Sequence, residues 1–218
     1  MRFLIGIFLF LFYAVSAQDN KPGVFKLKPS LGLNVCQVHG DNYNGYKKPG
    51  IFAGLAVNAR LDTKTSLELG FYYSQKGAWK NPTKFDFNYF RLNFNYIDLP
   101  ISLRYMLNSR YFVTAGPSIA YLVSYNANFN YIDISSDYTF KKYEVGVNIG
   151  LGRTMVKNFS VEFRCSNSIA SVMNYGVTKS TIFYPNPVAR FFNKGLYNNI
   201  LTLMFTYTLD RTKKSETP

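Results

Sequence analysis

The sequence predicts an all-β protein, an eight-stranded antiparallel up-and-down transmembrane β-barrel. Three observations carry this prediction. Apolar and polar residues alternate with a period of two, the connections are alternately short and long, and one face of the strands is reserved for small residues. An even strand number with short turns at one end is typical of bacterial outer-membrane barrels.

The segment YIDLPISLRYML shows the alternation most clearly. Ile97, Leu99, Ile101 and Leu103 share one parity, and polar or small residues share the other. Such a period places successive side chains on opposite faces of a strand. Eight segments of this kind can be marked, at residues 29–39, 50–61, 65–76, 94–107, 110–125, 139–154, 158–168 and 199–209.

The connections alternate strictly in length. Those after the second, fourth and sixth segments are the tight-turn sequences DTK, NS and the residues around MVKN. Those after the first, third, fifth and seventh segments are much longer. We therefore expect every turn at one end of the sheet and every loop at the other, with both termini on the turn side, as a chain arriving from the periplasm requires.

The N-terminus has the composition of a secretory signal peptide. Arg2 precedes an apolar run, and the small residues Ser16 and Ala17 come before polar Gln18. A run of about 13 apolar residues is short for a membrane-spanning helix, which argues against a retained anchor. We expect a signal peptide at 1–17, a lead-in at 18–28, an outer-membrane barrel at 29–209 and a polar tail at 210–218.

Alternation alone does not say which face meets the interior, because a lipocalin-like barrel and a membrane barrel have opposite arrangements. Residue size decides between them. In the sixth segment the bulky parity holds Tyr143, Val145, Val147, Ile149 and Leu151, and the other parity holds Gly146, Asn148, Gly150 and Gly152. Glycine weakens a solvent-facing strand, whereas a narrow lumen favours small side chains. We therefore expect the small parity inside.

The charges on the small parity are balanced. Four basic residues oppose four acidic ones: Arg60, Arg104, Lys142 and Arg164 against Glu68, Asp98, Glu144 and Glu162. Because a charge removed from water needs a partner, this set predicts a neutral network of ion pairs in the lumen. The chain's net charge of +13 then belongs to loops, turns and tails.

The residue types of common catalytic and metal sites are scarce. His39 is the single histidine, and Cys36 and Cys165 fall on opposite parities, so we expect free thiols and no zinc site. No GxSxG sequence accompanies His39. We expect no cofactor, no metal and no enzymatic activity.

Aromatic residues gather in two of the long connections. They are Trp79, Phe85, Phe87 and Tyr89 in the second, and Tyr184, Phe191 and Phe192 in the fourth. Beside lysines such residues can contact sugars, lipopolysaccharide phosphates or a protein partner. The alternative is that they pack on each other and extend the barrel above the membrane.

Several blocks carry a family resemblance: KPGIFAGLAVNARL at 48–61, LELGFYYSQKGA at 67–78, YIDLPISLRYML at 96–107, YFVTAGPSIAYLVS at 111–124 and KKYEVGVNIGLG at 141–152. In these blocks the chain resembles the PorT-like outer-membrane β-barrels of Bacteroidota over about residues 28–209. The resemblance implies an outer-membrane barrel, with a link to type IX secretion or envelope organisation. Unlike common outer-membrane barrels, the chain continues beyond its last strand into a polar tail.

Our expectation is thus an exported barrel in the outer membrane with a structural or loop-mediated interaction role. Its partners would be outer-membrane lipid, lipopolysaccharide and other envelope proteins, with no nucleic acid; the sequence leaves the oligomeric state open. Two alternatives stay open at this point. One is an outer-membrane enzyme acting on lipid or peptide at the loop side, and the other is a soluble periplasmic lipocalin-like binding barrel.

Overall fold

Eight long strands form most of the computed structural model, which describes residues 25–41, 45–174 and 195–209. Their bounds are Phe25–His39 (β1), Lys48–Arg60 (β2), Thr65–Lys80 (β3), Phe90–Met106 (β4), Tyr111–Phe129 (β5), Tyr143–Val156 (β7), Phe159–Ser168 (β8) and Gly195–Tyr207 (β10). The long connections hold three short elements, which are β6 (Ile132–Asp133), the 3-10 helix η1 (Ser135–Asp137) and β9 (Met173–Asn174). In these residue ranges no helix is long and apolar enough to cross a membrane.

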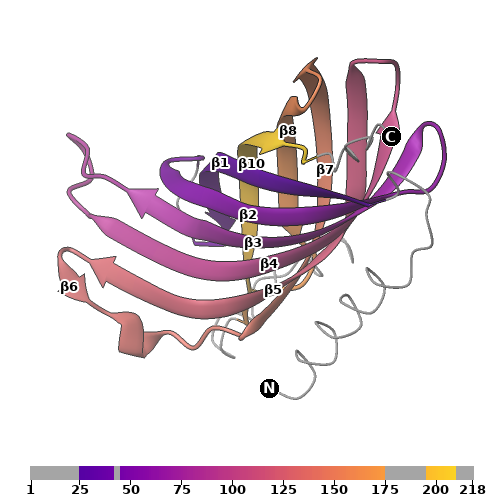
Figure 1. Cartoon of the computed structure of the whole chain (residues 1–218). Coiled ribbons are helices and arrows are strands. Elements are labelled where there is room, and N and C mark those ends of the chain that lie inside the picture. The colour runs from indigo at the N-terminus through magenta and orange to yellow at the C-terminus, as the bar shows by residue number, and fades with distance from the viewer. Residues whose placement is uncertain (1–24, 42–44, 175–194, 210–218) are drawn as a thin grey trace, which may run out of the picture.

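The long strands form one closed sheet (Figure 1). Each pairs antiparallel with the preceding long strand, and β10 returns to pair with β1. The closing register runs from Ser30 opposite Thr206 to His39 opposite Tyr197. The predicted eight-stranded up-and-down barrel is therefore confirmed.

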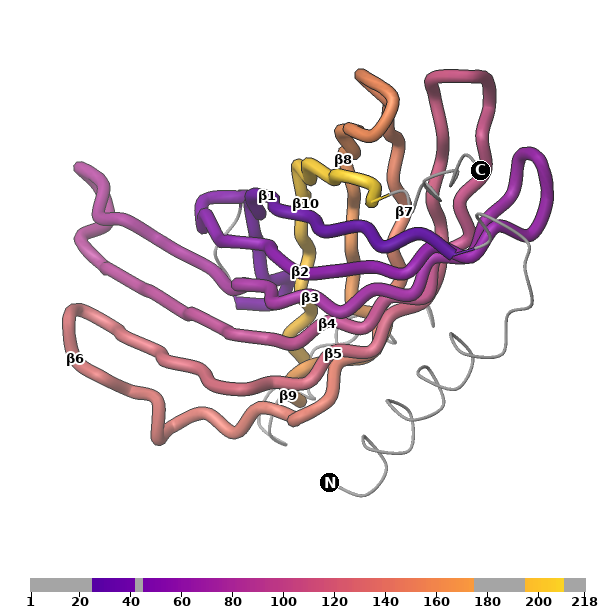
Figure 2. The backbone as a smooth tube through the Cα atoms, in the orientation of Figure 1, coloured from indigo at the N-terminus to yellow at the C-terminus, as the bar shows by residue number. Residues whose placement is uncertain are grey.

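The two ends of the barrel differ, as the connection lengths predict. Residues 61–64, 107–110 and 157–158 form short turns at one end, where β1 begins and β10 ends. We call this the turn end. The ends of β1, β3, β5 and β8, from which the longer connections leave, lie at the opposite end, the loop end (Figure 2). Short turns of outer-membrane barrels face the periplasm.

The outer face of the barrel is apolar. Large exposed side chains cover it on every long strand, among them Leu33, Ile51, Phe71, Ile101, Ile119, Ile149, Phe163 and Leu203. A water-soluble protein rarely leaves so large a contiguous apolar surface exposed. The soluble lipocalin-like alternative is therefore wrong, because its apolar face would have to point inward.

Two rows of exposed tyrosines bound this apolar surface. Tyr73, Tyr121 and Tyr143 lie toward the loop end, and Tyr105, Tyr111 and Tyr207 lie toward the turn end. On β5 the rows are ten residues apart, from Tyr111 to Tyr121. At roughly 3.3 Å per residue and a strand tilt of about 40°, this spacing gives about 25 Å along the membrane normal, the height of the lipid-facing band in such barrels.

Beyond the loop-end tyrosines the two faces of β3, β4 and β5 exchange character. Gln75, Asn95 and Ser124 lie side by side on the outer face, while Phe94 and Tyr96 are fully buried inside. Water surrounds the strands here, so polar residues face out and apolar residues face in. This exchange explains why the sequence placed the strand ends at residues 76, 94 and 125, short of the observed bounds.

A register shift on β5 accompanies the exchange. Ser124 is opposite Asn95 and Leu122 is opposite Tyr96, so Val123 has no cross-strand partner on β4. Val123 and Ser124 are both exposed. An extra residue of this kind is a β-bulge, and it inverts the phase of the side chains that follow.

The N-terminal boundary needs a correction. The predicted lead-in at 18–28 is wrong at its end, because β1 already begins at Phe25 and pairs there with Ala59 of β2. The predicted signal peptide at 1–17 and the tail at 210–218 lie outside the described residues.

Cys36 is buried inside, Cys165 is partly exposed, and both thiols are free, as predicted.

We predict that Val147→Lys blocks assembly of the barrel. Val147 is exposed on β7 between the two tyrosine rows, opposite Pro117 and Asn167. A lysine facing mid-bilayer lipid costs about 2–4 kcal/mol. Heat-modifiable migration on a gel and recovery in the outer-membrane fraction measure assembly.

Two matched changes serve as controls for this prediction. Asn126→Lys adds the same charge on the outer face of β5 beyond the tyrosine row, and Lys84→Ala changes the second long connection. Both should assemble like the parent protein. Equal assembly of Val147→Lys would reverse our assignment of the faces.

Candidate functional site

Buried charges of both signs line the lumen. The structure places six of the eight residues predicted for this network inside the barrel: Glu68, Asp98, Arg104, Glu144, Glu162 and Arg164. Two lysines join them, Lys28 from β1 and Lys76 from β3. Among the described residues that form ion pairs inside the barrel, four basic side chains thus face four acidic ones.

Two groups of ion pairs occupy the half of the lumen nearer the turn end. In the first, Glu68 accepts hydrogen bonds from Lys28, from Arg104 Nη1 at 2.9 Å and from Asn58 Nδ2 at 3.0 Å. In the second, Glu162 accepts from Arg164 Nε at 2.8 Å and from the Thr114 hydroxyl at 2.8 Å. Each group links two or more strands across the lumen.

A third group lies nearer the loop end and centres on Lys76. Its ammonium lies 2.9 Å from Asp98 Oδ1 and 3.3 Å from Glu144 Oε1, and 4.6 Å from the centre of the Tyr96 ring. Glu144 also accepts from Ser168 Oγ at 2.9 Å and from Asn198 Nδ2 at 2.8 Å. Opening a pore here would separate buried opposite charges, which is costly.

Glycines make room for these interior side chains. A Cβ atom on Gly150 would lie 2.4 Å from Glu162 Oε1, and one on Gly152 would lie 2.0 Å from the Phe112 ring. Both contacts are closer than atoms can approach without rearrangement. The small parity therefore faces a filled lumen, as the size of its residues predicts.

Arg60 and Lys142 were wrongly predicted to belong to the network. Arg60 ends β2 and is exposed, and its guanidinium donates to the carbonyl oxygens of Asp62 and Thr63 in the turn. Lys142 precedes β7 and is also exposed. Long basic side chains near strand ends reach water, so parity alone does not bury them.

Sequence reasoning missed Lys28 and Lys76, although a signal for each was available. Lys28 continues the inward parity of Ser30, Gly32 and Asn34 but was assigned to the lead-in. Lys76 continues the inward parity of β3 beyond Ser74. Extending the first segment by one residue would include Lys28, whereas Lys76 already ends the predicted segment 65–76 on the parity of Glu68.

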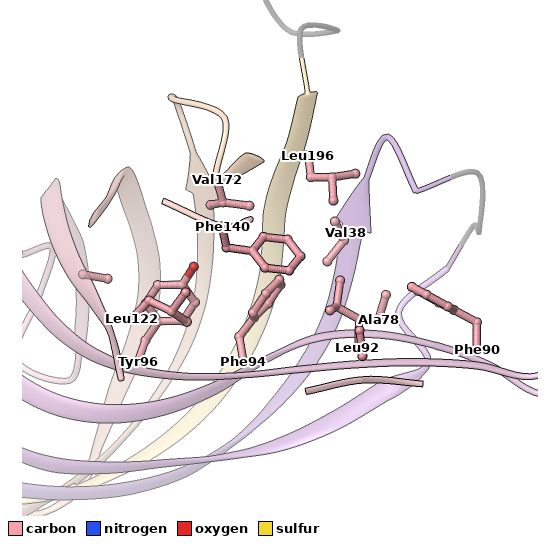
Figure 3. Packing of buried hydrophobic residues seen from close by; sticks show 12 residues of the cluster. Val38, Ala78, Phe90, Leu92, Phe94, Tyr96, Leu122, Phe140, Val172 and Leu196 are labelled. Atoms are coloured by element: carbon pink, nitrogen blue, oxygen red, sulfur yellow. The ribbon is translucent and has the colours of Figure 1, made fainter. Parts of the chain in front are cut away.

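Buried apolar side chains fill the lumen at the loop end. Figure 3 shows Phe94, Tyr96, Phe140, Leu92 and Val38 converging from different elements, and we call this cluster the apolar cap. Its full membership is Val38, Ala78, Phe90, Leu92, Phe94, Tyr96, Ala120, Leu122, Ala127, Phe140, Val172 and Leu196. The Phe94 and Phe140 rings meet edge to face, with centroids 4.7 Å apart. This packing covers the charged groups on the loop side.

The outermost part of β3–β5 carries exposed apolar residues. Phe85 and Phe87, in the connection between β3 and β4, are 98% and 82% exposed, and Tyr131 and Ile132 at the β5–β6 turn are 79% and 67% exposed. With Tyr89 they form what we call the aromatic tip. Predicted loop residues Phe85, Phe87 and Tyr89 therefore share one place in the fold.

Hydrogen bonds and ring stacking hold the two halves of the aromatic tip together. The Tyr89 and Tyr131 rings stack at 4.4 Å with an interplanar angle of 10°. The Tyr89 amide donates to Asn130 Oδ1, and the Asn130 amide donates to the Tyr89 carbonyl, both at 2.8 Å. Asn130 and Tyr131 adopt positive φ values of 48° and 66°, the sharp turn that this pairing requires.

An ion pair braces the connection that carries Phe85 and Phe87. Lys80, the last residue of β3, donates to the Asp86 carboxylate, which also accepts from the Asn88 amide at 3.0 Å. The hydrogen bond from Lys80 holds the pKa of the Asp86 carboxyl below its ordinary value. The carboxylate is therefore charged, and the brace intact, at neutral pH.

The remaining predicted loop residues do not belong to the aromatic tip. Trp79 lies within β3, where Arg91 stacks on its ring at 4.2 Å and its indole donates to Asn93 Oδ1 at 3.3 Å. The prediction of Trp79 as a loop residue is wrong because β3 continues to Lys80. Tyr184, Phe191 and Phe192 lie outside the described residues.

The described residues bring together no three histidine, cysteine, aspartate or glutamate side chains in a way that could hold a metal ion. His39 lies at the loop end of β1 and is exposed. The structure therefore directs attention to the filled lumen and the aromatic tip.

We predict that Arg164→Gln lowers the free energy of unfolding by about 3–5 kcal/mol, the usual effect of removing one partner of a buried ion pair. Arg60→Gln should change it by less than about 0.5 kcal/mol, because this arginine is exposed. Urea unfolding of the refolded barrel in lipid vesicles, followed by Trp79 fluorescence, measures both. If both variants lost the same free energy of unfolding, the buried Arg164–Glu162 pair would stabilise the barrel no more than the exposed Arg60 does.

Comparison with known proteins agrees with this architecture. The sequence matches a family model described as outer membrane protein beta-barrel domain over residues 16–174. No curated protein sequence matches the chain.

Similar solved structures include Ail of Yersinia pestis, with 12% identity over 86% of this chain and 100% of Ail and a TM-score of 0.48. Neisserial surface protein A is similar at 10% identity over 87% of this chain and 100% of its own, with a TM-score of 0.48. OprG of Pseudomonas aeruginosa is similar at 8% identity over 87% and 98%, with a TM-score of 0.45. The family match covers most of the chain, so this protein belongs to the outer membrane protein beta-barrel domain family and is an outer-membrane β-barrel protein.

Proposed function

We propose that this barrel is a binding protein that presents the aromatic tip to another protein of the cell envelope, and that it acts neither as an enzyme nor as a pore. The observation that carries the proposal is the exposure of Phe85 and Phe87 on a braced connection at the loop end. Isolated exposed apolar residues are common, but two nearly fully exposed phenylalanines on an ordered tip favour a docking role.

The aromatic tip is organised before any partner arrives. The Tyr89–Tyr131 stack and the paired backbone hydrogen bonds of Tyr89 and Asn130 fix the two connections relative to each other. Binding through a preorganised surface loses less conformational entropy than binding through free loops. Aromatic side chains are also the residue types that dominate binding energy at protein interfaces.

The strands beneath the tip form a stiff support. β3, β4 and β5 remain paired as far as Lys80, Phe90 and Phe129, well beyond the loop-end tyrosines. The apolar cap packs against their inner face. A partner would therefore meet the tip at a fixed height above the membrane.

A protein partner suits this surface better than the phosphates of lipopolysaccharide. Lys80 is already paired with Asp86, and the polar neighbours of the tip are amides such as Asn88 and Asn128. An aromatic centre with a polar rim is the usual composition of a protein interface. The PorT-like resemblance makes type IX secretion or envelope organisation the setting in which we propose to look for the partner.

Crosslinking from single positions in intact cells tests this proposal. A photoreactive amino acid at Ile132 should give a discrete adduct with one envelope protein, because Ile132 belongs to the aromatic tip. The same group at Tyr46, which is exposed in the first long connection, should give none. The double change Phe85→Ser and Phe87→Ser should reduce the Ile132 adduct at least about tenfold, as expected for loss of interface anchors.

Other outcomes would argue against the proposal. Adducts of equal yield from Ile132 and Tyr46 would indicate unspecific contact at the loop end. Lipid hydrolysis or acyl transfer by the purified protein that is lost in His39→Ala would instead support the enzymatic alternative.

A further inference from the structure

A cavity of about 290 Å³ lies at the turn end of the barrel, at the mouth opposite the apolar cap. Its walls come from β1, β2, β3, β4, β7 and β8 and from the turns at 61–64 and 157–158. We call it the turn-end cavity. Its volume is close to the lower bound of small-molecule pockets, about 300 Å³. Because the turn end faces the periplasm, a solute would enter from that side.

The turn-end cavity is strongly basic. Six basic residues line it: Lys26, Lys28, Arg60, Lys64, Arg104 and Lys157. Among the described residues of its lining Asp62 is the single acidic one, and its Oδ1 already accepts from the Thr63 amide at 2.6 Å. Converging positive charge at a concave, partly dry surface raises the local concentration of anions.

The deepest part of the lining holds buried hydrogen-bond donors that share one acceptor oxygen. Lys28 and Arg104 both donate to the same oxygen of Glu68, so two cations share one carboxylate. Arg104 is only 8% exposed, and Nη1 is the guanidinium nitrogen that has an acceptor among the described residues. Its remaining N–H groups are available to an anion, and a guanidinium binds oxyanions through two nitrogens at once.

A buried acceptor also lies in the lining. Asn158 Oδ1 is shielded from solvent and receives no hydrogen bond from the described residues. A buried oxygen of this kind calls for a donor such as a hydroxyl group. A ligand that carries both an anionic group and a hydroxyl would satisfy Asn158 and the basic side chains together.

We propose that the turn-end cavity binds a phosphate monoester from the periplasmic side. A phosphate presents several oxygens in different directions and up to two negative charges, which suits cations that converge from different strands. The phosphate could be carried by a soluble ester or by the headgroup of a phospholipid in the inner leaflet. This site lies at the other end of the barrel from the aromatic tip and does not depend on the function proposed for the tip.

Calorimetric titration of the refolded protein in an uncharged detergent tests the soluble source. Glycerol 3-phosphate should bind saturably, and raising the salt concentration to about 0.5 M should weaken binding strongly, because exposed rim charges are screened. Succinate should bind at least about tenfold more weakly, since it lacks the tetrahedral dianion. Native mass spectrometry after exposure to phosphatidic acid or to phosphatidylcholine tests the lipid source.

Rim variants locate the site without disturbing the buried ion pairs. Arg60→Gln and Lys157→Gln should each weaken binding about fivefold, the value expected for one exposed charge about 4 Å from the ligand. Arg110→Gln removes the same charge at the same end of the barrel, but Arg110 does not line the cavity. The Arg110→Gln variant should bind glycerol 3-phosphate with the same affinity as the parent protein.

Binding of glycerol 3-phosphate supports a soluble ligand, and selective retention of phosphatidic acid supports a lipid headgroup. Three results would overturn the proposal. They are binding in neither experiment, equal affinity for succinate, and equal loss of affinity in Arg110→Gln and Arg60→Gln.

Discussion

The pairing of β1 with β10 is the interaction on which the rest of the molecule depends. Hydrocarbon offers no hydrogen-bonding partner to a free strand edge, so a spanning sheet must satisfy every edge group within itself. The register from Ser30–Thr206 to His39–Tyr197 does this for both end strands. Closure with eight strands in turn produces an interior just wide enough for side chains to fill.

The contents of that interior follow from its narrowness. Glycines at 150 and 152 leave space for Glu162 and Phe112, and Glu162 finds its partners in Arg164 on the same strand and Thr114 on β5. The filling is also asymmetric along the barrel. The apolar cap closes the loop end, whereas the turn end keeps a cavity rich in basic side chains. At the loop end the protein thus exposes the aromatic tip, and at the turn end it exposes a polar, cationic surface to the periplasm.

Much of the membrane-spanning part could be predicted from the sequence, because each strand there has one face toward lipid and one toward a crowded lumen. The parity of Val147 and Asn148 is enough to assign both faces of β7. Prediction failed where a strand leaves the bilayer. In lipid the apolar side chains face outward, whereas in water they face the interior. Phe90 lies outside the predicted segment 94–107, although it begins β4 and packs in the apolar cap.

The site residues show the same limit. Glu68 and Arg104 lie within β3 and β4 and were predicted to lie in the lumen, where the structure places them. Arg60 and Lys142 lie at strand ends, where a long side chain can turn toward water and parity loses its force. The joining of Tyr89 to Tyr131 depends on contacts between distant connections, which no local pattern contains.

The register shift at Val123 marks the place where β5 passes from lipid to water. Because the phase of β5 changes at this residue, Tyr121 points to lipid while Tyr125 packs against the apolar cap. Moving the barrel outward would bring the lipid-facing Ile119 into water, and moving it inward would bury Ser124 and Asn126 in hydrocarbon. A single extra residue therefore lets odd-numbered side chains of β5 face lipid before the bulge and the interior after it, while Ser124 and Asn126 face the water outside.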